Sequence, residues 1–331
     1  MSGTSAVTQE SGAGESPEQA ASALKRAAAY FAERFPLLTH GLLILSFYSS
    51  NQFLAHVLVQ PGEPMRYDAR SLMGYVTMLC FFLHLRIFDD HKDFFDDSRN
   101  FPNRVLQRGE ITLKELKYIG ALAIGMELLL GLLAGSAAFV SVLIVLAYSI
   151  LMLKEFFIRN WLKRHFLIYV STHMLIMPLL ALLVFSFATG RYPWQAPGWF
   201  WLYSLVGFFV AFNWEVSRKI RAPGDEIEGL DSYTKQFGTY GAAYLVLFIR
   251  IIDTGLVTLV AIHLGLSAWF YVWLFALFLV CMIGFVHYRF WTTSATARRL
   301  EIYAGIYIVA FDLALAVELG HTFGITFAGV G

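Results

Sequence analysis

Residues 116–156 read LKYIGALAIGMELLLGLLAGSAAFVSVLIVLAYSILMLKEF, a run dominated by apolar side chains. A helix that spans a membrane needs about 20 mostly apolar residues. This run supplies two such stretches, 116–135 and 137–156, on either side of Gly135-Ser136. Because the connection is so short, the two helices must form an antiparallel hairpin. The run therefore predicts a protein built from membrane-spanning helices.

Seven further stretches of the chain have the same apolar character, and Pro, Gly or charged residues separate them. They lie at residues 37–59, 71–88, 166–188, 197–214, 239–263, 267–287 and 302–325. The sequence thus predicts an all-α, polytopic membrane protein. We expect nine transmembrane helices surrounding a central cavity that opens near the cytoplasmic side.

The composition of the 331 residues supports the same class of protein. Hydrophobic residues make up 57% and charged residues 15%, whereas soluble domains contain about 45–50% and about 25%. The net charge of +1 gives no basic field, so we expect no nucleic-acid partner. The two cysteines, Cys80 and Cys281, both lie in apolar runs and fit neither a disulfide framework nor a zinc site.

The distribution of Lys and Arg predicts the orientation in the membrane. Most of them follow the second, fourth, sixth and eighth predicted helices, and the alternate loops contain only Arg66, Arg70 and Arg191. Since cytoplasmic loops carry the excess of basic residues, we expect a cytoplasmic N-terminus and a C-terminus outside, in a cell inner membrane. Residues 1–24, rich in Ser, Gly, Ala and Glu, are expected to form a disordered cytoplasmic tail before a membrane domain over 25–331. Residues 22–34 are expected to form an interfacial helix.

The first acidic segment follows the second predicted span, where residues 86–97 read RIFDDHKDFFDD. If the helix continues past Phe88, then Asp89, Asp93 and Asp97 recur at i, i+4 and i+8 on one face, where like charges repel. Asp90 lies beside them. Mg²⁺ would remove the conflict, because it takes carboxylate oxygens and keeps positions open for phosphate. The alternative is a solvated acidic patch under the membrane.

The second acidic segment follows the sixth predicted span, where residues 213–231 read NWEVSRKIRAPGDEIEGLD. Pro223-Gly224 should end the helix, and Asp225, Glu226 and Asp231 follow the break. The alternative is a surface turn of mixed charge. Four predicted helices separate the two segments and both should face the cytoplasm, which suggests an internal pseudo-repeat. Two acidic rims facing each other would hold metal ions bridged by a polyanion.

Basic residues in the same loops complete this pattern. Carboxylates, Mg²⁺ and cationic side chains together are what the binding and departure of a diphosphate require. The alternative is that these basic residues only set the topology. The candidates for diphosphate binding are Arg104, Arg108, Lys154, Lys219 and Arg221.

These motifs resemble those of the UbiA superfamily of intramembrane prenyltransferases over residues 25–331. The first segment resembles the family's Asn-Asp-x-x-Asp-x-x-x-Asp, and residues 103–111 resemble its Arg-Pro-x-x-x-Gly-x-Ile stretch. Tyr148-Ser149 with Lys154 is similar to its Tyr-Ser-x-x-x-x-Lys element. Residues 215–231 resemble its Lys-Asp-x-x-Asp-x-x-Gly-Asp motif more loosely.

Three positions depart from the family pattern. Asp89 stands where the family has Asn, Val105 stands where it has Pro, and residues 220–225 are extra between Lys219 and the acidic part of the second motif. The extra residues leave the register of the second motif open. The first departure makes Asp89-Asp90-x-x-Asp93 similar to the Asp-Asp-x-x-Asp of soluble terpene synthases. A terpene cyclase therefore stays an alternative function.

The resemblance implies that Mg²⁺ held by both motifs neutralises the diphosphate leaving from an isoprenyl diphosphate donor. The allylic cation would form among the helices, within the lipid bilayer, and a lipophilic or aromatic acceptor would attack it. The expected catalytic residues are Asp90, Asp93, Asp97, Asp225 and Asp231. The expected metal ligands are Asp89, Asp90, Asp93, Asp97, Asp225, Glu226 and Asp231.

Polar residues at or within the predicted spans are candidates for an acceptor or prenyl pocket. They are Asn51, Tyr148, His173, Asn213 and Glu215. His173 or Asp253 would be a base for the final proton, although a hydrogen-bonded structural role is favoured for each of them. Arg250 and Asp253, three residues apart, are expected to pair with each other.

Three functions compete at this stage. The leading hypothesis is a Mg²⁺-dependent prenyltransferase, and the second is a membrane terpene cyclase that needs no acceptor. The third is a transporter or divalent-cation channel, which the position of the carboxylates at the cytoplasmic edge disfavours, since transporters bind near the bilayer midplane.

Overall fold

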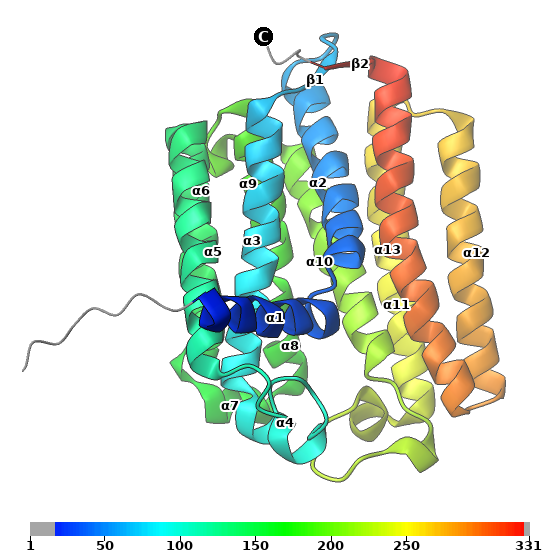
Figure 1. Ribbon diagram of the computed structural model, residues 1–331. Helices are drawn as coiled ribbons and strands as arrows, with labels where there is room; N and C mark the ends of the chain where they lie inside the picture. Colours follow the sequence, from blue (N-terminus) through cyan, green and yellow to red (C-terminus); the bar gives the residue numbers. More distant parts are fainter. Residues whose placement is uncertain (1–16, 328–331) are drawn as a thin grey trace, which may run out of the picture.

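The structure is a computed structural model that describes residues 17–327, and most of them are helical (Figure 1). The long helices run side by side, which confirms the all-α polytopic class. The helices are α1 (Pro17–Arg34), α2 (Leu37–Val59), α3 (Ala69–Lys92), α4 (Phe94–Asn100), α5 (Leu113–Ala134), α6 (Ser136–Leu153), α7 (Arg159–Arg164), α8 (Phe166–Met174), α9 (Ile176–Thr189), α10 (Gly198–Arg218), α11 (Tyr233–Leu264), α12 (Ala268–Phe290) and α13 (Ser294–Phe323). Three 3₁₀ turns, η1 (Glu155–Phe157), η2 (Pro193–Gln195) and η3 (Pro223–Asp225), and two strands, β1 (Met65–Tyr67) and β2 (Ile325–Phe327), complete the order.

Eight helical segments in the described part of the chain are long and apolar enough to cross a membrane, with α8 and α9 counted together. Helix α10 is a further long helix of 21 residues and packs against α9, α11 and α13. The predicted number of nine crossings therefore stays a prediction, as does the side of the membrane on which each end lies. The apolar core runs through the bundle and includes Tyr48, Phe81, Phe185 and Tyr307, all fully buried.

The predicted hairpin is confirmed by α5 and α6, which pack together and meet at Gly135. Gly135 has φ 112°, a left-handed conformation that glycine adopts without the steric cost of a Cβ. Helix α5 begins at a capping box, where Thr112 Oγ1 accepts from the Glu115 amide and Glu115 Oε2 accepts from the Thr112 amide. Such a box satisfies amides that would otherwise lack partners.

The first acidic segment departs from the predicted continuous helix. Helix α3 ends at Lys92, and Asp93, with φ −99° and ψ 7°, separates it from α4. Asp97 therefore lies on a short separate helix rather than two turns further along α3. The predicted span 166–188 is likewise divided, at Leu175, into α8 and α9.

The two ends of the bundle differ in structure (Figure 1). One end carries α4, α7 and the loop over residues 219–232, and we call it the acidic end because both acidic segments lie there. The other end carries β1 and β2, which pair in parallel with Met65 opposite Ile325. The shared location of the two segments is what the proposed pseudo-repeat requires.

Helix α1 lies crosswise to the long helices (Figure 1), as an interfacial helix would. It begins at Pro17, so residues 17–24 are helical and correct the predicted boundary of the disordered tail at residue 24. Residues 1–16 of that tail lie outside the described residues, as do the last residues, 328–331.

A buried ion pair within α11 is hydrogen-bonded to α10 deep in the bundle. Arg250 Nη1 lies 2.9 Å from Asp253 Oδ2, and Arg250 Nη2 donates to Asn213 Oδ1 at 2.9 Å. The guanidinium also lies 3.5 Å from the centre of the Tyr307 ring. The expected pairing of Arg250 with Asp253 is confirmed, and it leaves Asn213 in a structural role.

We expect Arg250→Met to lower the free energy of unfolding by about 3–5 kcal/mol, because it leaves a buried carboxylate without its partner. Thermal unfolding in detergent measures the loss. The control is Arg108→Gln, which breaks an exposed ion pair with Glu110 worth about 0–1 kcal/mol. Equal stability of the two variants would contradict the structural role of the buried pair.

Candidate functional site

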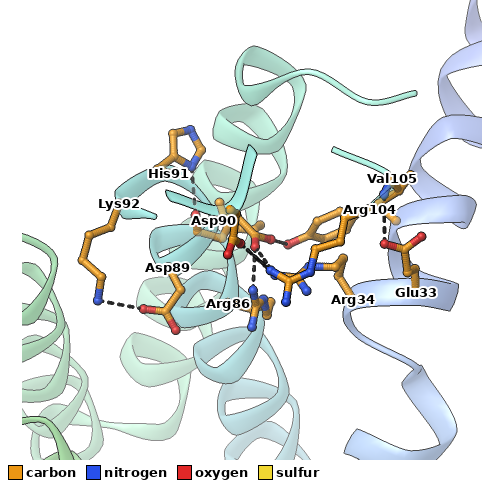
Figure 2. A network of polar contacts seen from close by, with 12 residues as sticks. Glu33, Arg34, Arg86, Asp89, Asp90, His91, Lys92, Arg104 and Val105 are labelled. Carbon is orange, nitrogen blue, oxygen red and sulfur yellow. Dashed lines mark hydrogen bonds and ion pairs between the residues drawn. The ribbon is translucent and has the colours of Figure 1, made fainter. Parts of the chain in front are cut away.

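The acidic side chains of the first segment divide between two environments. Asp90 and Asp97 lie among arginines, whereas Asp89 and Asp93 lie beside Lys92. Figure 2 shows Asp90 pointing toward Arg34 and Arg86, with Asp89 and Lys92 turned to the other side of α3. The end of α3 thus presents one face rich in cations and one face rich in anions.

Asp90 is almost fully buried, and donors surround its carboxylate. Its Oδ2 accepts from Tyr30 Oη at 2.7 Å, and its Oδ1 accepts from Arg34 Nη2 and Arg86 Nη2, each at 2.6 Å. Burial, and then the charge of Asp90, raise the pKa of Tyr30 far above its ordinary value, so Tyr30 keeps its proton to donate. Charge-assisted bonds of this kind fix the orientation of a carboxylate.

Asp97 lies on α4 and faces two arginines, of which Arg34 is shared with Asp90. Its Oδ2 accepts from Arg104 Nη1 at 2.5 Å and lies 3.8 Å from Arg34 Nη2. Arg104 also covers the Phe101 ring at 3.9 Å. Three arginines therefore accompany two aspartates on this face, which leaves it with one positive charge in excess.

The other face is negative. Lys92 Nζ lies 3.2 Å from Asp89 Oδ1, and about half of the Asp89 side chain is exposed. Burial raises the pKa of Asp93 above its ordinary value; Lys92 opposes the shift, and the carboxylates of Asp89, Asp97 and Glu155 add to it. A carboxyl group surrounded by other carboxylates in this way is one that a cation would stabilise.

Glu155 is a candidate site residue that was not predicted from the sequence. It is 4% exposed and lies in η1, where Glu155, Phe156 and Phe157 all have positive φ values between 46° and 59°. Three consecutive side-chain-bearing residues in this conformation are unfavourable, and such strain clusters at functional sites. Arg159 Nε lies 2.8 Å from Glu155 Oε2, without hydrogen-bond geometry. The adjacent acidic residue after Lys154 was the available signal.

Aromatic rings extend from the anionic face toward the break between α8 and α9 at Leu175. His173 is stacked on Tyr169 with ring centres 4.4 Å apart and contacts Phe156, which in turn contacts Tyr148. His173 Nδ1 faces the Tyr169 carbonyl at 2.8 Å, while its buried Nε2 has no hydrogen-bond partner among the described residues. Tyr148 donates to the Thr172 carbonyl at 2.6 Å.

An apolar groove of about 460 Å³ begins at Tyr148 and lies between α6, α9 and α10. Its walls include Leu175, Pro178, Trp201 and Leu202. Such a lining suits a hydrocarbon chain rather than a charged group. The predicted central cavity opening toward the cytoplasm stays a prediction.

The second acidic segment begins with a carboxylate that is already paired. Glu215 is 5% exposed; its Oε1 lies 2.6 Å from Lys219 Nζ, and its Oε2 accepts from Arg218 Nε at 2.6 Å. The expectation that Lys219 accounts for the charge of Glu215 is confirmed. In this structure Glu215 and Lys219 therefore pair with each other.

The later carboxylates of this segment differ in accessibility. Glu226 accepts from the hydroxyl groups of Ser232 and Thr234 at the start of α11. Asp225 and Asp231 are exposed, and their carboxylates have no hydrogen-bond or ion-pair partner among the described residues. These two side chains are thus the ones free to turn toward a ligand.

Several predicted site residues do not contact the carboxylates of the predicted metal ligands. Arg108 is exposed and pairs with Glu110, Lys154 is exposed at the end of α6, and Arg221 reaches only the Asp225 carbonyl at 3.4 Å. Asn51 is buried in α2, where its Nδ2 donates to the Phe47 carbonyl. No hydrogen bond or ion pair links the first segment to the second within the described side chains.

The chemistry of the anionic face fits a hard divalent cation. No three His, Cys, Asp or Glu side chains of the described residues already converge as a ligand set. Mg²⁺ usually takes one or two carboxylates, several waters and substrate phosphates rather than a protein cage. Asp89 and Asp93 supply two such carboxylates beside a cationic face, and they therefore fit that mode of binding.

Comparisons with known proteins find the same family that the motifs suggested. The UbiA prenyltransferase family matches residues 52–308, which is more than half of the chain. No curated protein matches the chain.

Solved structures of UbiA homologues share the fold. A digeranylgeranylglyceryl phosphate synthase is 18% identical, with a TM-score of 0.61 over 89% of this chain and 99% of that one. A UbiA homologue from Aeropyrum pernix K1 is 15% identical, with a TM-score of 0.61 over 83% of this chain and 96% of that one. One from Archaeoglobus fulgidus, bound to GPP and Mg²⁺, is 14% identical, with a TM-score of 0.56 over 87% of this chain and 99% of that one.

Proposed function

Because the chain belongs to the UbiA prenyltransferase family, we propose that it is a Mg²⁺-dependent intramembrane enzyme that transfers the prenyl group of an isoprenyl diphosphate to a lipophilic or aromatic acceptor. The observation that carries the proposal is the division of the first acidic segment into an anionic and a cationic face at one helix end. A metal–diphosphate complex needs both, since its metal seeks carboxylates and its phosphate oxygens seek guanidinium groups.

The anionic face would hold the metal through Asp89 and Asp93, with Glu155 adding negative charge behind them. Bound Mg²⁺ would supply Lewis-acid stabilisation of the departing diphosphate. Asp90 and Asp97 would keep their arginine partners and fix the shape of this site. Asp225 and Asp231, exposed at the same end of the bundle, would complete it from the second segment.

Arg104 and other accessible cationic side chains of the acidic end would bind the diphosphate itself. In the reaction, the bond between the allylic carbon and the diphosphate oxygen breaks, and the electron pair leaves with the diphosphate. Arg104 lies on the cationic face, and about a quarter of its side chain is exposed. Lys92, Arg108, Lys154, Lys219 and Arg221 are the other candidates at the acidic end. Fixed cations of this kind stabilise charge that develops in the transition state.

The prenyl group would be housed among apolar and aromatic side chains. The groove that begins at Tyr148 lies next to the ring series Phe156, His173 and Tyr169, which ends beside the anionic face. Aromatic faces stabilise a neighbouring cation. His173, whose Nε2 has no hydrogen-bond partner among the described residues, would take the proton that the acceptor loses after the new bond forms.

A membrane terpene cyclase is the second candidate. The presence of Asp89 in place of the family's Asn favours it, because the segment then reads Asp-Asp-x-x-Asp as in soluble terpene synthases. The two functions share the ionisation step and differ in whether an acceptor is consumed.

The test is a product screen by mass spectrometry on purified protein. Isoprenyl diphosphates with 10, 15 and 20 carbons would be supplied with Mg²⁺, with and without a membrane extract as a source of acceptors. We expect a prenylated product only with the extract. A hydrocarbon or alcohol formed without it would establish the cyclase, and the absence of any product would contradict both candidates.

The second acidic segment gives a separate prediction. We expect Asp225→Asn and Asp231→Asn each to raise the Mg²⁺ concentration for half-maximal rate by about 10-fold or more, as loss of a metal-site group does. Glu226→Gln should have a smaller effect and Glu215→Gln the smallest, because their carboxylates already have partners.

Activity titrated against Mg²⁺ for the four single variants measures this order. Amide substitution keeps the shape of each side chain, so the variants serve as controls for one another. A shift confined to Glu215→Gln would place the site at the end of α10 and contradict the proposed register.

A further inference from the structure

Helix α1 lies outside the family match, yet it contacts the first acidic segment directly. Tyr30, Glu33 and Arg34 reach this segment and the loop after it, and Figure 2 shows Glu33 and Arg34 pointing from α1 toward Val105 and Asp90. Their spacing of i, i+3 and i+4 places them on one face of the helix. One face of α1 thus forms a wall of the proposed site.

Tyr30 and Arg34 fix the carboxylate of Asp90 from two directions. Tyr30 binds Oδ2 and Arg34 binds Oδ1, at 2.7 Å and 2.6 Å. Among the described residues, Arg86 is the one donor that reaches the Asp90 carboxylate from α3 itself. Because Asp90 lies in the last turn of α3, between Asp89 and Asp93, two of its three donors tie the end of that helix to α1.

Glu33 holds the basic loop after α4 in the same way. Its Oε1 accepts from the Val105 amide at 2.9 Å, and its Oε2 lies 3.5 Å from Arg108 Nη2. Tyr30 packs with Val105 and Leu106 in a small apolar cluster. The same helix therefore sets the place of the loop that carries Arg104.

We infer that α1 is a positioning element of the reaction, in which Tyr30 and Arg34 orient the end of α3 so that Asp89 and Asp93 present their oxygens to the metal. The inference rests on the proposed function. Residues that orient the ligands of a metal typically change its affinity or the activity by about 10–100-fold when they are replaced. Neither residue is expected to touch the substrate.

A purely structural role of α1 would have a different signature. If α1 only stabilised the bundle, its loss of contacts would lower the unfolding temperature but leave the metal affinity of the folded protein unchanged. The deciding quantity is therefore the affinity for metal, measured directly rather than through turnover.

The experiment uses the full chain in lipid nanodiscs with Mn²⁺ as the probe, because its free concentration can be read by electron paramagnetic resonance. Tyr30→Phe keeps the buried ring and removes the donor to Asp90. Arg34→Gln removes the donor and the charge. We expect both variants to bind Mn²⁺ about 10-fold or more weakly than the wild type, and Arg34→Lys to regain part of the loss.

The matched control lies on the same helix face. Arg26 pairs with Glu115 at 2.6 Å, away from Asp90, so Arg26→Gln removes a contact between α1 and α5 without touching the first acidic segment. This pair is only partly buried, and ion pairs near the surface are worth about 0–1 kcal/mol. We expect Mn²⁺ affinity within about five-fold of the wild type for this variant, because an energy of up to about 1 kcal/mol corresponds to about five-fold in affinity.

Two results would overturn the inference while the proposed function stands: Tyr30→Phe and Arg34→Gln binding Mn²⁺ as the wild type does, or Arg26→Gln losing as much affinity as they do. If Arg34→Gln fails to fold, Tyr30→Phe still decides the question. Wild-type protein that binds no Mn²⁺ and releases no diphosphate would overturn the proposed function, and the inference with it.

Discussion

Replacing Asp93 by asparagine is expected to lower turnover by about 10²–10³-fold, the loss that follows removal of one electrostatic group from an active site. Asp93 ends α3 and lies among the carboxylates of Asp89, Asp97 and Glu155. The amide keeps the shape of the side chain but gives the metal a neutral ligand. The measurement is the initial rate of product formation at saturating Mg²⁺.

Stability should not fall with activity in this variant. The raised pKa of Asp93 means that its charged form is less favourable here than in water. Removing the charge is therefore expected to leave the unfolding temperature unchanged or slightly higher. The control is Asp96→Asn, since Asp96 is an exposed residue of α4 without an ion-pair partner among the described residues. A similar loss in both variants, or near-normal activity of Asp93→Asn, would contradict the assigned role.

Removal of divalent metal should have an effect at least as large. With excess chelator we expect the rate to fall by about 10³-fold or more, because Lewis-acid stabilisation of a leaving group is worth several kcal/mol. Without metal, the cations that the described residues place against the repulsion on the anionic face are Lys92, beside Asp89, and Arg159, beside Glu155. Readdition of Mg²⁺ should restore the rate, and the rate at each metal concentration is the measurement.

The fold itself should survive this treatment. The apolar core runs through the bundle, away from the carboxylates, so the unfolding temperature with chelator should remain close to that with Mg²⁺. A chelated protein that keeps its full rate would contradict the metal requirement. One that unfolds would show that the metal has a structural role which the structure does not indicate.

The helices could be predicted from the sequence because their signal is local. Helix α2 occupies residues 37–59, as expected, since Pro36 precedes the apolar run and a polar turn follows it. The hairpin at Gly135 follows from the backbone preference of a single residue. Helix α10 ends at Arg218, before the break that was predicted at Pro223. The division of the span 166–188 at Leu175 was missed, because its residues are apolar on both sides of the break.

The candidate site was predictable only as a set of residue types. The Asp spacing identified the right segment, but the partner of each carboxylate depends on how distant helices cross. Asp90 meets Tyr30 and Arg34 only because α1 lies across α3. Glu155 reaches the anionic face through a turn with positive φ values, and no pattern of residue types in the sequence predicts such a turn. These contacts are tertiary, so they cannot be predicted from hydrophobic periodicity.

The release of inorganic diphosphate from an isoprenyl diphosphate tests the central claim most directly, because every version of the proposed function begins with that bond breaking. Purified wild-type protein in nanodiscs would be given a 15-carbon diphosphate and an acceptor extract, with Mg²⁺ or with chelator. We expect diphosphate to appear with Mg²⁺, in equal amount to the prenylated product, and to stop with chelator and in Asp93→Asn. No release under any of these conditions, together with Mg²⁺ flux into liposomes that contain the protein, would contradict the account and establish transport instead.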